Sequence, residues 1–291
     1  MVIIKITGGL GNQLFQFALG LALEETLGFQ VKYDLSAYKI VGSRKFDLDK
    51  FVGNLKIANS EEIERNNNVI QKIKFQIFQW VGFPFGLKEL KYYLERNFKY
   101  DANVFELAND VYLSGYWQSE RYFFNHRVKL LERIKISDSH SPDSMTYLKQ
   151  IRSSNSVSIH VRRGDYISNS KANSIYATCD LGYYEKAIQH LSAQFEDLTF
   201  FVFSDDMEWV TTHFSKFERI IFVNVNLGDK AFEDLKLMSN CKHNIIANST
   251  FSWWAAWLNQ YERKVVIAPK SWYTQKWRNS ANLVPADWYR L

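Results

Sequence analysis

The sequence predicts an α/β protein with two Rossmann-like domains, the second of which contains a buried parallel sheet. After residue 155, short apolar runs of strand-forming residues alternate with helical stretches, which is the pattern of βαβ units. Near the N-terminus a strand, a glycine turn, a helix and a second strand follow one another, as in half of a nucleotide-binding fold. A polar, turn-rich segment at 137–144 separates these two patterns. We therefore expect an N-terminal domain at 1–140 and a C-terminal domain at 141–291.

The N-terminal pattern has clear boundaries. The apolar run VIIKIT at 2–7 predicts a strand, and GGLGNQ at 8–13 predicts a tight turn. Apolar residues then recur at helical spacing over 14–28, and Gly28 predicts the end of that helix. The short run VKYD at 31–34 predicts the next strand.

The middle of the first domain is less regular. Residues 61–98 are predicted to be helical and basic, and VYLSGYW at 111–117 is predicted to be a strand. The segment IQKIKFQIFQWVGF at 70–83 combines basic and aromatic residues, which allows two interpretations. We favour an amphipathic helix that packs on its own domain. The alternative is a helix that lies peripherally on the inner membrane beside a lipid-linked acceptor.

The second domain is predicted from five strands and the helices between them. The strands are expected at SVSIHV (156–161), TFFVFS (199–204), RIIFVNV (219–225), HNIIAN (243–248) and KVVIAP (264–269). The helices are expected at 182–195, 206–214, 229–240 and 250–261. We expect that the last residues of the chain can pack back on the first domain.

Composition and charge narrow the classes of protein. With 291 residues, 46% of them hydrophobic, the chain can bury a full core and does not have a disordered composition. The net charge of +5 is too mild and too scattered for a nucleic-acid binder. Cys179 and Cys241 lack the spacing of a disulfide framework or a zinc site. The sequence shows no signal peptide and no apolar run of ~20 residues, so we expect a cytoplasmic protein.

Polar residues follow each predicted strand of the second domain. Ligands bind at the carboxyl ends of the strands in open parallel sheets. The residues at these ends are His160, Arg162, Arg163, Gly164 and Asp165 after the first strand, Ser204, Asp205 and Asp206 after the second, Asn224 and Asn226 after the third, and Asn248, Ser249 and Thr250 after the fourth. Together they predict a binding site at one edge of the sheet.

The two arginines and the histidine each have two interpretations. Arg162 and Arg163 are either a solvated loop paired with Asp165 or a phosphate site, because a guanidinium matches phosphate oxygens bidentately. Gly164 permits a close backbone approach. His160 is either a core histidine or a contact to the base of a nucleotide.

The remaining candidates carry similar alternatives. Asn248, Ser249 and Thr250 predict a helix N-cap, which can also serve as a phosphate site. The tryptophans of the following helix are expected in the core. Asp205 and Asp206 are adjacent and not in a DxD pattern, so we expect one to accept from a ligand N–H and the other to cap the next helix.

Four segments carry a resemblance to a known family. GGLGNQLFQFA, HVRRGDY, FSDD and NSTFSWWAAWL occur in this order within residues 3–269. In these segments the chain resembles the α-1,2-fucosyltransferases of glycosyltransferase family 11, of the bacterial type. The resemblance implies a GT-B-like fold with two domains facing across a cleft. It also implies inverting transfer of L-fucose from GDP-fucose to the 2-hydroxyl of a terminal galactose, with no cofactor and no metal.

The resemblance also assigns roles to residues. It implies that Arg162 binds the β-phosphate and that Gly9, Gly11 and Asn12 lie in the donor and acceptor cleft. The implied donor-binding set is His160, Arg162, Arg163, Ser204, Asp205, Asp206, Asn248, Ser249, Thr250, Phe251 and Ser252. The implied acceptor is a galactose-terminated oligosaccharide or lipid-linked glycan of a bacterial surface.

The proton acceptor and the reaction class stay open at this point. Asp165 is a candidate catalytic base by position, but a structural role beside the arginines is favoured, and a late proton transfer to phosphate would need no base. The alternatives to the implied activity are a fucosyltransferase of another linkage, another GDP-sugar transferase, and a non-catalytic nucleotide- or sugar-binding protein.

Overall fold

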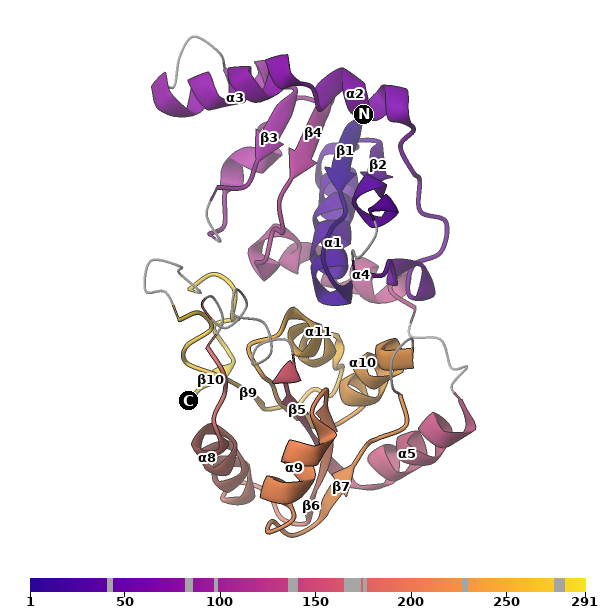
Figure 1. The fold of residues 1–291 in the computed structure, drawn as a ribbon, viewed down its shortest axis with the longest axis vertical. Coiled ribbons are helices and arrows are strands. Elements are labelled where there is room, and N and C mark those ends of the chain that lie inside the picture. Colours follow the sequence, from indigo (N-terminus) through magenta and orange to yellow (C-terminus); the bar gives the residue numbers. More distant parts are fainter. Residues whose placement is uncertain are drawn as a thin grey trace. The chain divides into compact units, whose positions relative to one another are not determined.

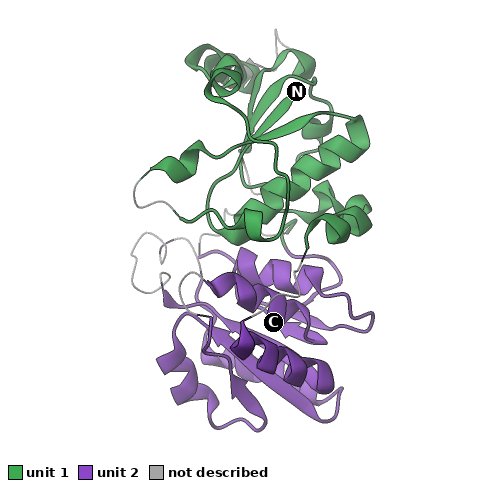
Figure 2. Cartoon of the chain, turned by 90° about the vertical axis from the view of Figure 1, so that its right-hand side faces the viewer, with its two compact units in different colours: residues 1–135, 281–283 green, residues 136–280, 284–291 purple. Residues whose placement is uncertain are grey.

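The chain divides into two compact units, each built on a parallel sheet (Figures 1 and 2). The computed structural model describes residues 1–40, 44–81, 86–96, 99–135, 141–164, 174, 177–226, 230–274 and 281–291. Unit 1 comprises Met1–Lys135 and Ala281–Leu283, and unit 2 comprises Ile136–Ser280 and Val284–Leu291. Of the predicted boundary segment at 137–144, residues 137–140 lie outside the described part of the chain. The two parallel sheets confirm the predicted α/β fold class.

Unit 1 contains a four-stranded sheet in the order β2-β1-β4-β3. Its strands are β1 (Val2–Lys5), β2 (Val31–Asp34), β3 (Tyr92–Leu94) and β4 (Val111–Ser114). Each neighbouring pair is parallel, so the carboxyl ends of all four strands lie at the same edge. Strand β3 corrects the sequence prediction, which placed it inside a helical segment at 61–98. The short run of two tyrosines and a leucine gives too little periodicity to distinguish strand from helix.

Helices and short 3-10 turns surround this sheet. They are α1 (Leu10–Leu27), η1 (Ser36–Lys39), η2 (Leu48–Lys50), α2 (Ser60–Asn66), α3 (Val69–Val81), η3 (Leu87–Glu89), η4 (Ala102–Phe105), η5 (Glu120–Tyr122), η6 (Phe124–His126) and α4 (Arg127–Arg133). Helix α1 ends at Gly28 as predicted, because Gly28 adopts a left-handed φ of 66° and donates its N–H to the carbonyl of Glu24.

Helix α1 begins earlier than the sequence suggested. Its first residue is Leu10, so the last four residues of GGLGNQ form the first turn of the helix and only the two glycines precede it. From Leu10 to Leu23 nearly every side chain is buried, including Gln13 and Gln16. A helix that is apolar almost all round must be covered on all sides, and α1 contacts β1, β2, η5 and η6.

Unit 2 contains a six-stranded parallel sheet in the order β10-β9-β8-β5-β6-β7. Its strands are β5 (Asn155–Val161), β6 (Leu198–Ser204), β7 (Ile220–Phe222), β8 (His243–Ile245), β9 (Val266–Ala268) and β10 (Tyr289–Arg290). Its helices are α5 (Pro142–Ser153), α8 (Leu181–Ser192), α9 (Met207–Phe214), α10 (Ala231–Ser239) and α11 (Thr250–Leu258). The five predicted strands are all present, and the two-residue β10 is an addition.

Strand β5 is buried on both faces because its side chains alternate between two helix layers. Val157, Ile159 and Val161 pack into the core formed with α8 and α9. On the other face, Ser158 accepts a hydrogen bond from Asn244, which also donates to the carbonyl of Met238 in α10. Because His160 shares the pleat face of Ser158, it points toward the α10 and α11 side of the sheet.

The connection order creates a switch point beside β5. From β5 the chain continues through β6 and β7 on one side, and it then returns to place β8, β9 and β10 on the other side. Open parallel sheets leave a crevice at the carboxyl ends of the strands where the order reverses. In unit 2 that crevice lies between β5 and β8, so the turns after these strands are the ones positioned for a ligand.

The tryptophans of α11 belong to the core, as predicted. Trp253, Trp254 and Trp257 are buried, and the rings of Trp254 and Trp257 meet edge to face with centroids 5.2 Å apart. They fix α11 against the sheet and thereby fix the position of its first turn. None of the helices in the described part of the chain is long and apolar enough to span a bilayer.

Candidate active site

Ion pairs tie together the turns that follow β5 and β6. Nη1 of Arg162 lies 3.0 Å from Oδ2 of Asp205, and their side chains are 25% and 28% exposed. The other carboxylate oxygen of Asp205 accepts the backbone N–H of Arg163 at 2.8 Å. Asp205 therefore holds the turn after β5 through both of its carboxylate oxygens. The Arg162 guanidinium keeps its charge beside solvent, where it is accessible to an anionic ligand.

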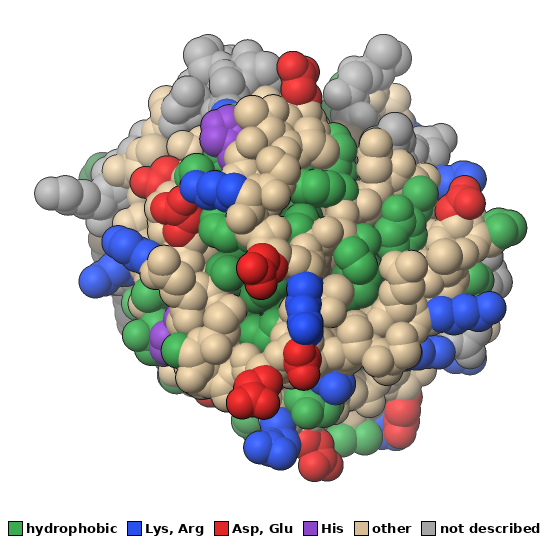
Figure 3. All heavy atoms as spheres, turned by 90° about the horizontal axis from the view of Figure 1, so that it is seen from below, with side chains coloured by type: hydrophobic (Ala, Val, Ile, Leu, Met, Phe, Trp, Pro, Cys, Tyr) green, Lys and Arg blue, Asp and Glu red, His purple; other side chains and the backbone are tan. Residues whose placement is uncertain are grey.

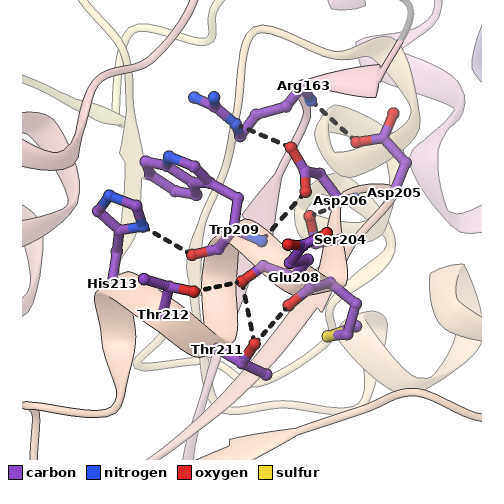
Figure 4. Close-up of polar contacts among 10 residues, drawn as sticks. Arg163, Ser204, Asp205, Asp206, Glu208, Trp209, Thr211, Thr212 and His213 are labelled. Atoms are coloured by element: carbon purple, nitrogen blue, oxygen red, sulfur yellow. Dashed lines mark hydrogen bonds and ion pairs between the residues drawn. The ribbon is translucent and has the colours of Figure 1, made fainter.

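The second arginine has a different environment (Figure 4). Nε of Arg163 donates to Oδ2 of Asp206 at 3.2 Å, and its guanidinium carbon lies 4.0 Å from the centroid of the Trp209 ring. Oδ1 of Asp206 accepts the N–H of Trp209 at 3.1 Å and so caps α9. Arg163 is thus held by an ion pair and a cation–π contact. Asp206 is the acid that caps the next helix, a role the sequence left open between two residues.

The Asp205 carboxylate lies close to the backbone of Gly164. A Cβ on Gly164 would lie 2.8 Å from Oδ2 of Asp205, closer than side chains are found. The turn after β6 is held by Ser204, because its Oγ accepts the N–H of Asp206 at 2.9 Å. Close approach of backbone and carboxylate therefore sets the spacing between the two turns.

His160 is a buried histidine with an unused nitrogen. Its side chain is 6% exposed, its ring centroid lies 5.7 Å from that of Phe251, and Nδ1 has no hydrogen-bond partner among the described residues. Burial lowers the pKa of His160 to about 4, with Asp205 raising it and Arg162 lowering it. The ring is therefore neutral at pH 7. A buried ring nitrogen without a partner is costly, and a ligand that hydrogen-bonds there would remove that cost.

The first turn of α11 lies beside His160. Ser249 is the N-cap, and its Oγ accepts the N–H of Phe251 at 3.3 Å. Thr250 and Phe251 are partly exposed at the start of the helix, where backbone N–H groups and the helix dipole favour an anion. This places Ser249, Thr250 and Phe251 at the crevice between β5 and β8.

Two predicted donor-binding residues are directed into the protein. Asn248 is fully buried, and its Nδ2 donates to the carbonyl oxygens of Ala177 and, at 3.0 Å, Trp272. The hydroxyl of Ser252 donates to the carbonyls of Ala247 and Ser249 at 3.4 and 3.3 Å. These contacts give both side chains a role in holding the segment before α11. Asp165, the candidate base, lies outside the described residues.

Unit 1 also gathers polar side chains at the carboxyl edge of its sheet. Gly8 adopts a φ of 83° after β1, and Gly9 is the N-cap of α1. Gly11 is buried in the first turn, while Asn12 is partly exposed. Oδ1 of Asn12 accepts a hydrogen bond of 2.8 Å from Nε2 of Gln118, in the loop after β4. Of the predicted cleft residues, Asn12 therefore presents its side chain at this edge.

Two buried glutamines, which the sequence reasoning missed, hold the loops at this edge. Nε2 of Gln13 donates to the carbonyls of Gly8 and Lys45, and its Oε1 accepts the N–H groups of Asp47 and Leu48, each at 2.9–3.0 Å. Gln16 accepts the N–H of Thr7 and donates to the carbonyl of Gly115. The spacing NQLFQ was the available signal, because residues three apart lie on one helix face.

Glu95 is a titratable group at the carboxyl edge of the sheet in unit 1. It follows β3, and its two carboxylate oxygens accept the N–H groups of Tyr116 and Trp117 at 2.6 and 3.1 Å. Trp117 is fully buried with a φ of 57°, an uncommon conformation for a non-glycine residue. Burial is the main cause that raises the pKa of Glu95 to about 7, and Asp101 raises it further. Glu95 thus supports the strained turn that precedes Gln118.

The charges of the molecule are otherwise mixed. On the face seen in Figure 3, Lys and Arg side chains lie among Asp and Glu side chains and do not form one continuous basic surface. A nucleic-acid backbone requires such a surface, so this face does not favour that class of ligand. Within the described ranges, no group of three or more His, Cys, Asp and Glu residues is arranged to hold a metal ion.

A family model matches the chain along its full length. The model is described as glycosyl transferase family 11, and the match covers residues 1–291. The chain is 35% identical over 299 residues to an alpha-1,2-colitosyltransferase of Escherichia coli, which covers 100% of this chain and 99% of that protein. It is 30% identical over 305 residues to the O-antigen biosynthesis glycosyltransferase WbnK of Escherichia coli, covering 98% and 99% of the two chains.

More distant proteins are similar to the chain in sequence or in fold. The galactoside 2-alpha-L-fucosyltransferase Sec1 of Mus musculus is 24% identical over 264 residues, which is 89% of this chain and 64% of that protein. The crystal structure of the fucosyltransferase NodZ from Bradyrhizobium superposes with a TM-score of 0.50 at 15% identity, covering 87% and 91% of the two chains. A mutant of Arabidopsis thaliana FUT1 in complex with GDP gives a TM-score of 0.53 at 10% identity, covering 91% and 69%. The structural likenesses show the GT-B-like α/β fold.

Proposed function

This chain belongs to glycosyl transferase family 11, and on that premise we propose that it transfers L-fucose from GDP-fucose to the 2-hydroxyl of a terminal galactose. The observation that carries the proposal is the set of groups at the switch point of unit 2. Arg162, the unpartnered Nδ1 of His160 and the first turn of α11 lie at the ends of β5 and β8. A guanidinium and a helix N-terminus suit a diphosphate, and a buried neutral imidazole suits a hydrogen-bonding base or sugar.

The proposed reaction is a displacement at the anomeric carbon of the fucose. The bond from that carbon to the β-phosphate oxygen breaks while the bond to the galactose O2 forms on the opposite face, which inverts the configuration of the carbon. The proton of the hydroxyl passes to a base or to the phosphate of the departing GDP. Negative charge grows on the departing GDP. Fixed donors that meet this charge supply the largest part of such catalysis. In this proposal Arg162 binds the β-phosphate, and the N–H groups at the start of α11 bind the other side of the diphosphate.

We propose that the protein provides this charge compensation without a metal ion. Arg162 is oriented by Asp205, so the guanidinium is held in place before the donor arrives. The carboxylates of Asp205 and Asp206 are each engaged by an arginine, which disfavours their use as metal ligands. An arginine has five N–H donors, so a pair with Asp205 is compatible with a bidentate phosphate contact.

The relative at 35% identity supports colitose as an alternative donor sugar. That protein is named an alpha-1,2-colitosyltransferase, and colitose differs from fucose by lacking the hydroxyl at carbon 3. The linkage in its name agrees with the proposed attack by a 2-hydroxyl. The relative WbnK is named for O-antigen biosynthesis, which supports a surface glycan as the acceptor. The relative Sec1 is named a galactoside fucosyltransferase, which supports a galactose as the accepting sugar. The alternative function is therefore transfer of colitose from GDP-colitose to the same hydroxyl.

One assay separates these possibilities. The protein is incubated with lactose and EDTA, with GDP-fucose or GDP-colitose as the donor, and the products are identified by mass and by NMR. We expect α-1,2-fucosyl-lactose in EDTA, and the colitose product is lighter by one oxygen atom. GDP binding without transfer to any galactoside would instead indicate a binding protein. Activity that is lost in EDTA and restored by a divalent cation would contradict the metal-independent mechanism.

A further inference from the structure

Helix α3 (Val69–Val81) packs on unit 1 through Phe75 and exposes five other apolar side chains. Phe75 is 2% exposed and points inward, where its ring lies 5.1 Å from that of Tyr93 and 5.9 Å from that of Tyr92. The exposed apolar side chains, here called the α3 stripe, are Val69 (70%), Ile70 (65%), Ile73 (49%), Ile77 (40%) and Trp80 (89%). Single exposed apolar residues are ordinary, but a contiguous group indicates an interaction surface.

The geometry of the helix places positive charge on both sides of this stripe. At about 100° per residue, the five side chains fall within an arc of about 100°, with Phe75 on the opposite side of the helix. Lys72 lies beyond one border of the arc, where its Nζ is 5.6 Å from the centroid of the Tyr92 ring, and Lys74 lies beyond the other border. Both lysines are partly exposed. The sequence of α3, VIQKIKFQIFQWV, contains no Asp or Glu. The surface is therefore apolar along its middle and cationic along its flanks.

We propose that the α3 stripe inserts into the surface of an anionic phospholipid bilayer. The lysines would meet the negatively charged headgroups, while the apolar side chains enter the boundary between headgroups and acyl chains. Trp80 is the most exposed member of the stripe, and tryptophan favours this boundary because its ring is apolar and its N–H is polar. With 13 residues, α3 is about 20 Å long, which is too short to cross the bilayer and suits a helix lying in its plane.

The charges favour a lipid surface over a second copy of the chain. A two-fold contact through the stripe would bring Lys72 and Lys74 of both copies to the borders of one interface. The helix offers no carboxylate to pair with them. Like charges across an interface oppose association, whereas an anionic membrane attracts every one of these lysines.

The surface is separate from the polar edge of unit 1. Phe75 anchors α3 against Tyr92 and Tyr93, the first residues of β3, whereas Glu95 follows the carboxyl end of the same strand. Helix α3 accordingly lies beside the start of β3 (Figure 1). Changes to the stripe therefore leave Asn12, Gln118 and the groups of unit 2 in place. The proposal is independent of the proposed sugar transfer.

Vesicle flotation tests the proposal. The full chain is floated with phosphatidylcholine vesicles and with vesicles that also contain phosphatidylglycerol, and we expect it to rise with the anionic vesicles. The variant Ile70→Gln/Ile73→Gln/Trp80→Gln should lower the ratio of bound to free protein by about tenfold or more. Lys72→Gln/Lys74→Gln should remove the preference for phosphatidylglycerol. The matched control is Phe124→Gln/Val128→Gln, which removes apolar side chains that are 59% and 71% exposed elsewhere in unit 1 and should float like the wild type.

Two results would overturn the proposal. One is wild-type protein that stays in the soluble fraction with both kinds of vesicle. The other is a wild-type dimer, seen by light scattering, that the triple variant converts to a monomer, because the stripe would then bind a second copy. Transfer to lactose and thermal unfolding are measured for every variant, so that lost flotation is not confused with unfolding. If the triple variant fails to fold, Trp80→Gln and the lysine variant decide the question.

Discussion

The carboxyl edges of the two sheets carry different kinds of polar group. At the edge of unit 2, arginine–carboxylate pairs and a helix N-terminus surround a buried histidine. At the edge of unit 1, the polar side chains are mostly amides, namely Asn12, Gln13, Gln16 and Gln118, with Glu95 bonded to backbone N–H groups. Both sheets are parallel and both edges follow the same topological rule, so the residues in the turns decide what each edge can bind.

The two edges hold their loops in different ways: unit 2 uses ion pairs, and unit 1 uses mainly neutral amides. In unit 2 the carboxylates of Asp205 and Asp206 pair with the arginines and fix the position of these cations at the edge of the sheet. In unit 1 the buried glutamines use their amides on backbone groups and thereby hold three loops without adding charge. An edge rich in amides suits the hydroxyls of a sugar, whereas an edge rich in arginines suits the phosphates of a nucleotide.

The largest expected effect comes from removing the Arg162 guanidinium at the carboxyl edge of unit 2. Arg162→Ala should lower kcat for transfer from GDP-fucose to lactose by about 10²–10³-fold, because one fixed donor to the leaving diphosphate is lost. Arg162→Lys should restore little, since an ammonium lacks the planar fork of a guanidinium. Steady-state kinetics measures both.

The control for this prediction is another paired arginine. Arg219 bonds Asp197 at 2.6 Å, but the two side chains are 55% and 78% exposed, and such surface pairs contribute little. Arg219→Ala should therefore keep wild-type turnover. If Arg162→Ala also keeps it, the charged edge of unit 2 is not the diphosphate site.

The next largest effect is expected from removing the side-chain amide of Gln13 in unit 1. Gln13→Leu should lower the free energy of unfolding by about 1–3 kcal/mol, because the N–H groups of Asp47 and Leu48 would lose their acceptor and that of Leu48 is buried. Urea titration measures the change. Gln30→Leu, at an exposed position of the same unit, is the control and should change stability by less than about 0.5 kcal/mol. A loss no larger than in this control would mean that Gln13 does not hold the loops.

The third prediction concerns acid. The folded-state pKa of His160, about 4, lies below its ordinary value of 6.5, so the unfolded chain binds a proton that the folded chain does not. As pH falls from 6.5 to 4, the contribution of His160 should lower the free energy of unfolding by about 1–3 kcal/mol. His160→Gln should remove this part of the pH dependence, while His190→Gln should not. Identical slopes for wild type and His160→Gln would contradict the prediction.

The smallest expected effect has the opposite sign and belongs to unit 1. The folded-state pKa of Glu95, about 7, lies above its ordinary value of 4.5, so the folded chain keeps a proton that the unfolded chain loses. As pH rises from 4.5 through 7, the contribution of Glu95 should lower the free energy of unfolding by about 1 kcal/mol, since the side chain is partly exposed. Glu95→Gln should flatten this part of the curve. A wild-type contribution that instead grows with pH would refute it.

The sequence was sufficient for the parts of the fold with strong local patterns. The strands of unit 2 and the end of α1 at Gly28 lie where apolar runs and a glycine predicted them. The strand-end rule also predicted that Arg162 and Asp205 lie at the same edge of the sheet. Their ion pair was not predicted, and it forms because β5 and β6 are parallel neighbours with Val161 opposite Ser204. Strand β3 was missed because three residues carry too little pattern.

Other features depend on contacts between distant segments. The sequence did not indicate that Trp209 would stack on Arg163, or that Glu95 would accept the N–H groups of a turn more than 20 residues away. It also did not reveal that the apolar side of α3 faces outward, since the same periodicity fits a helix that packs on its own domain. Amphipathic spacing defines a face, but packing decides where that face points.

The sequence by itself therefore determined the fold class, the family motifs and which residues follow the strands of the second sheet. Those properties are local, since strand and helix periods and the order of motifs can be read along one chain. The tertiary structure decided which of two arginines is oriented by Asp205 beside the crevice and which is packed on Trp209. It also decided that His160 is buried and that its Nδ1 has no hydrogen-bond partner among the residues that the structure describes. Burial and pairing arise only when segments far apart in sequence pack together, so they cannot be read from the order of residues.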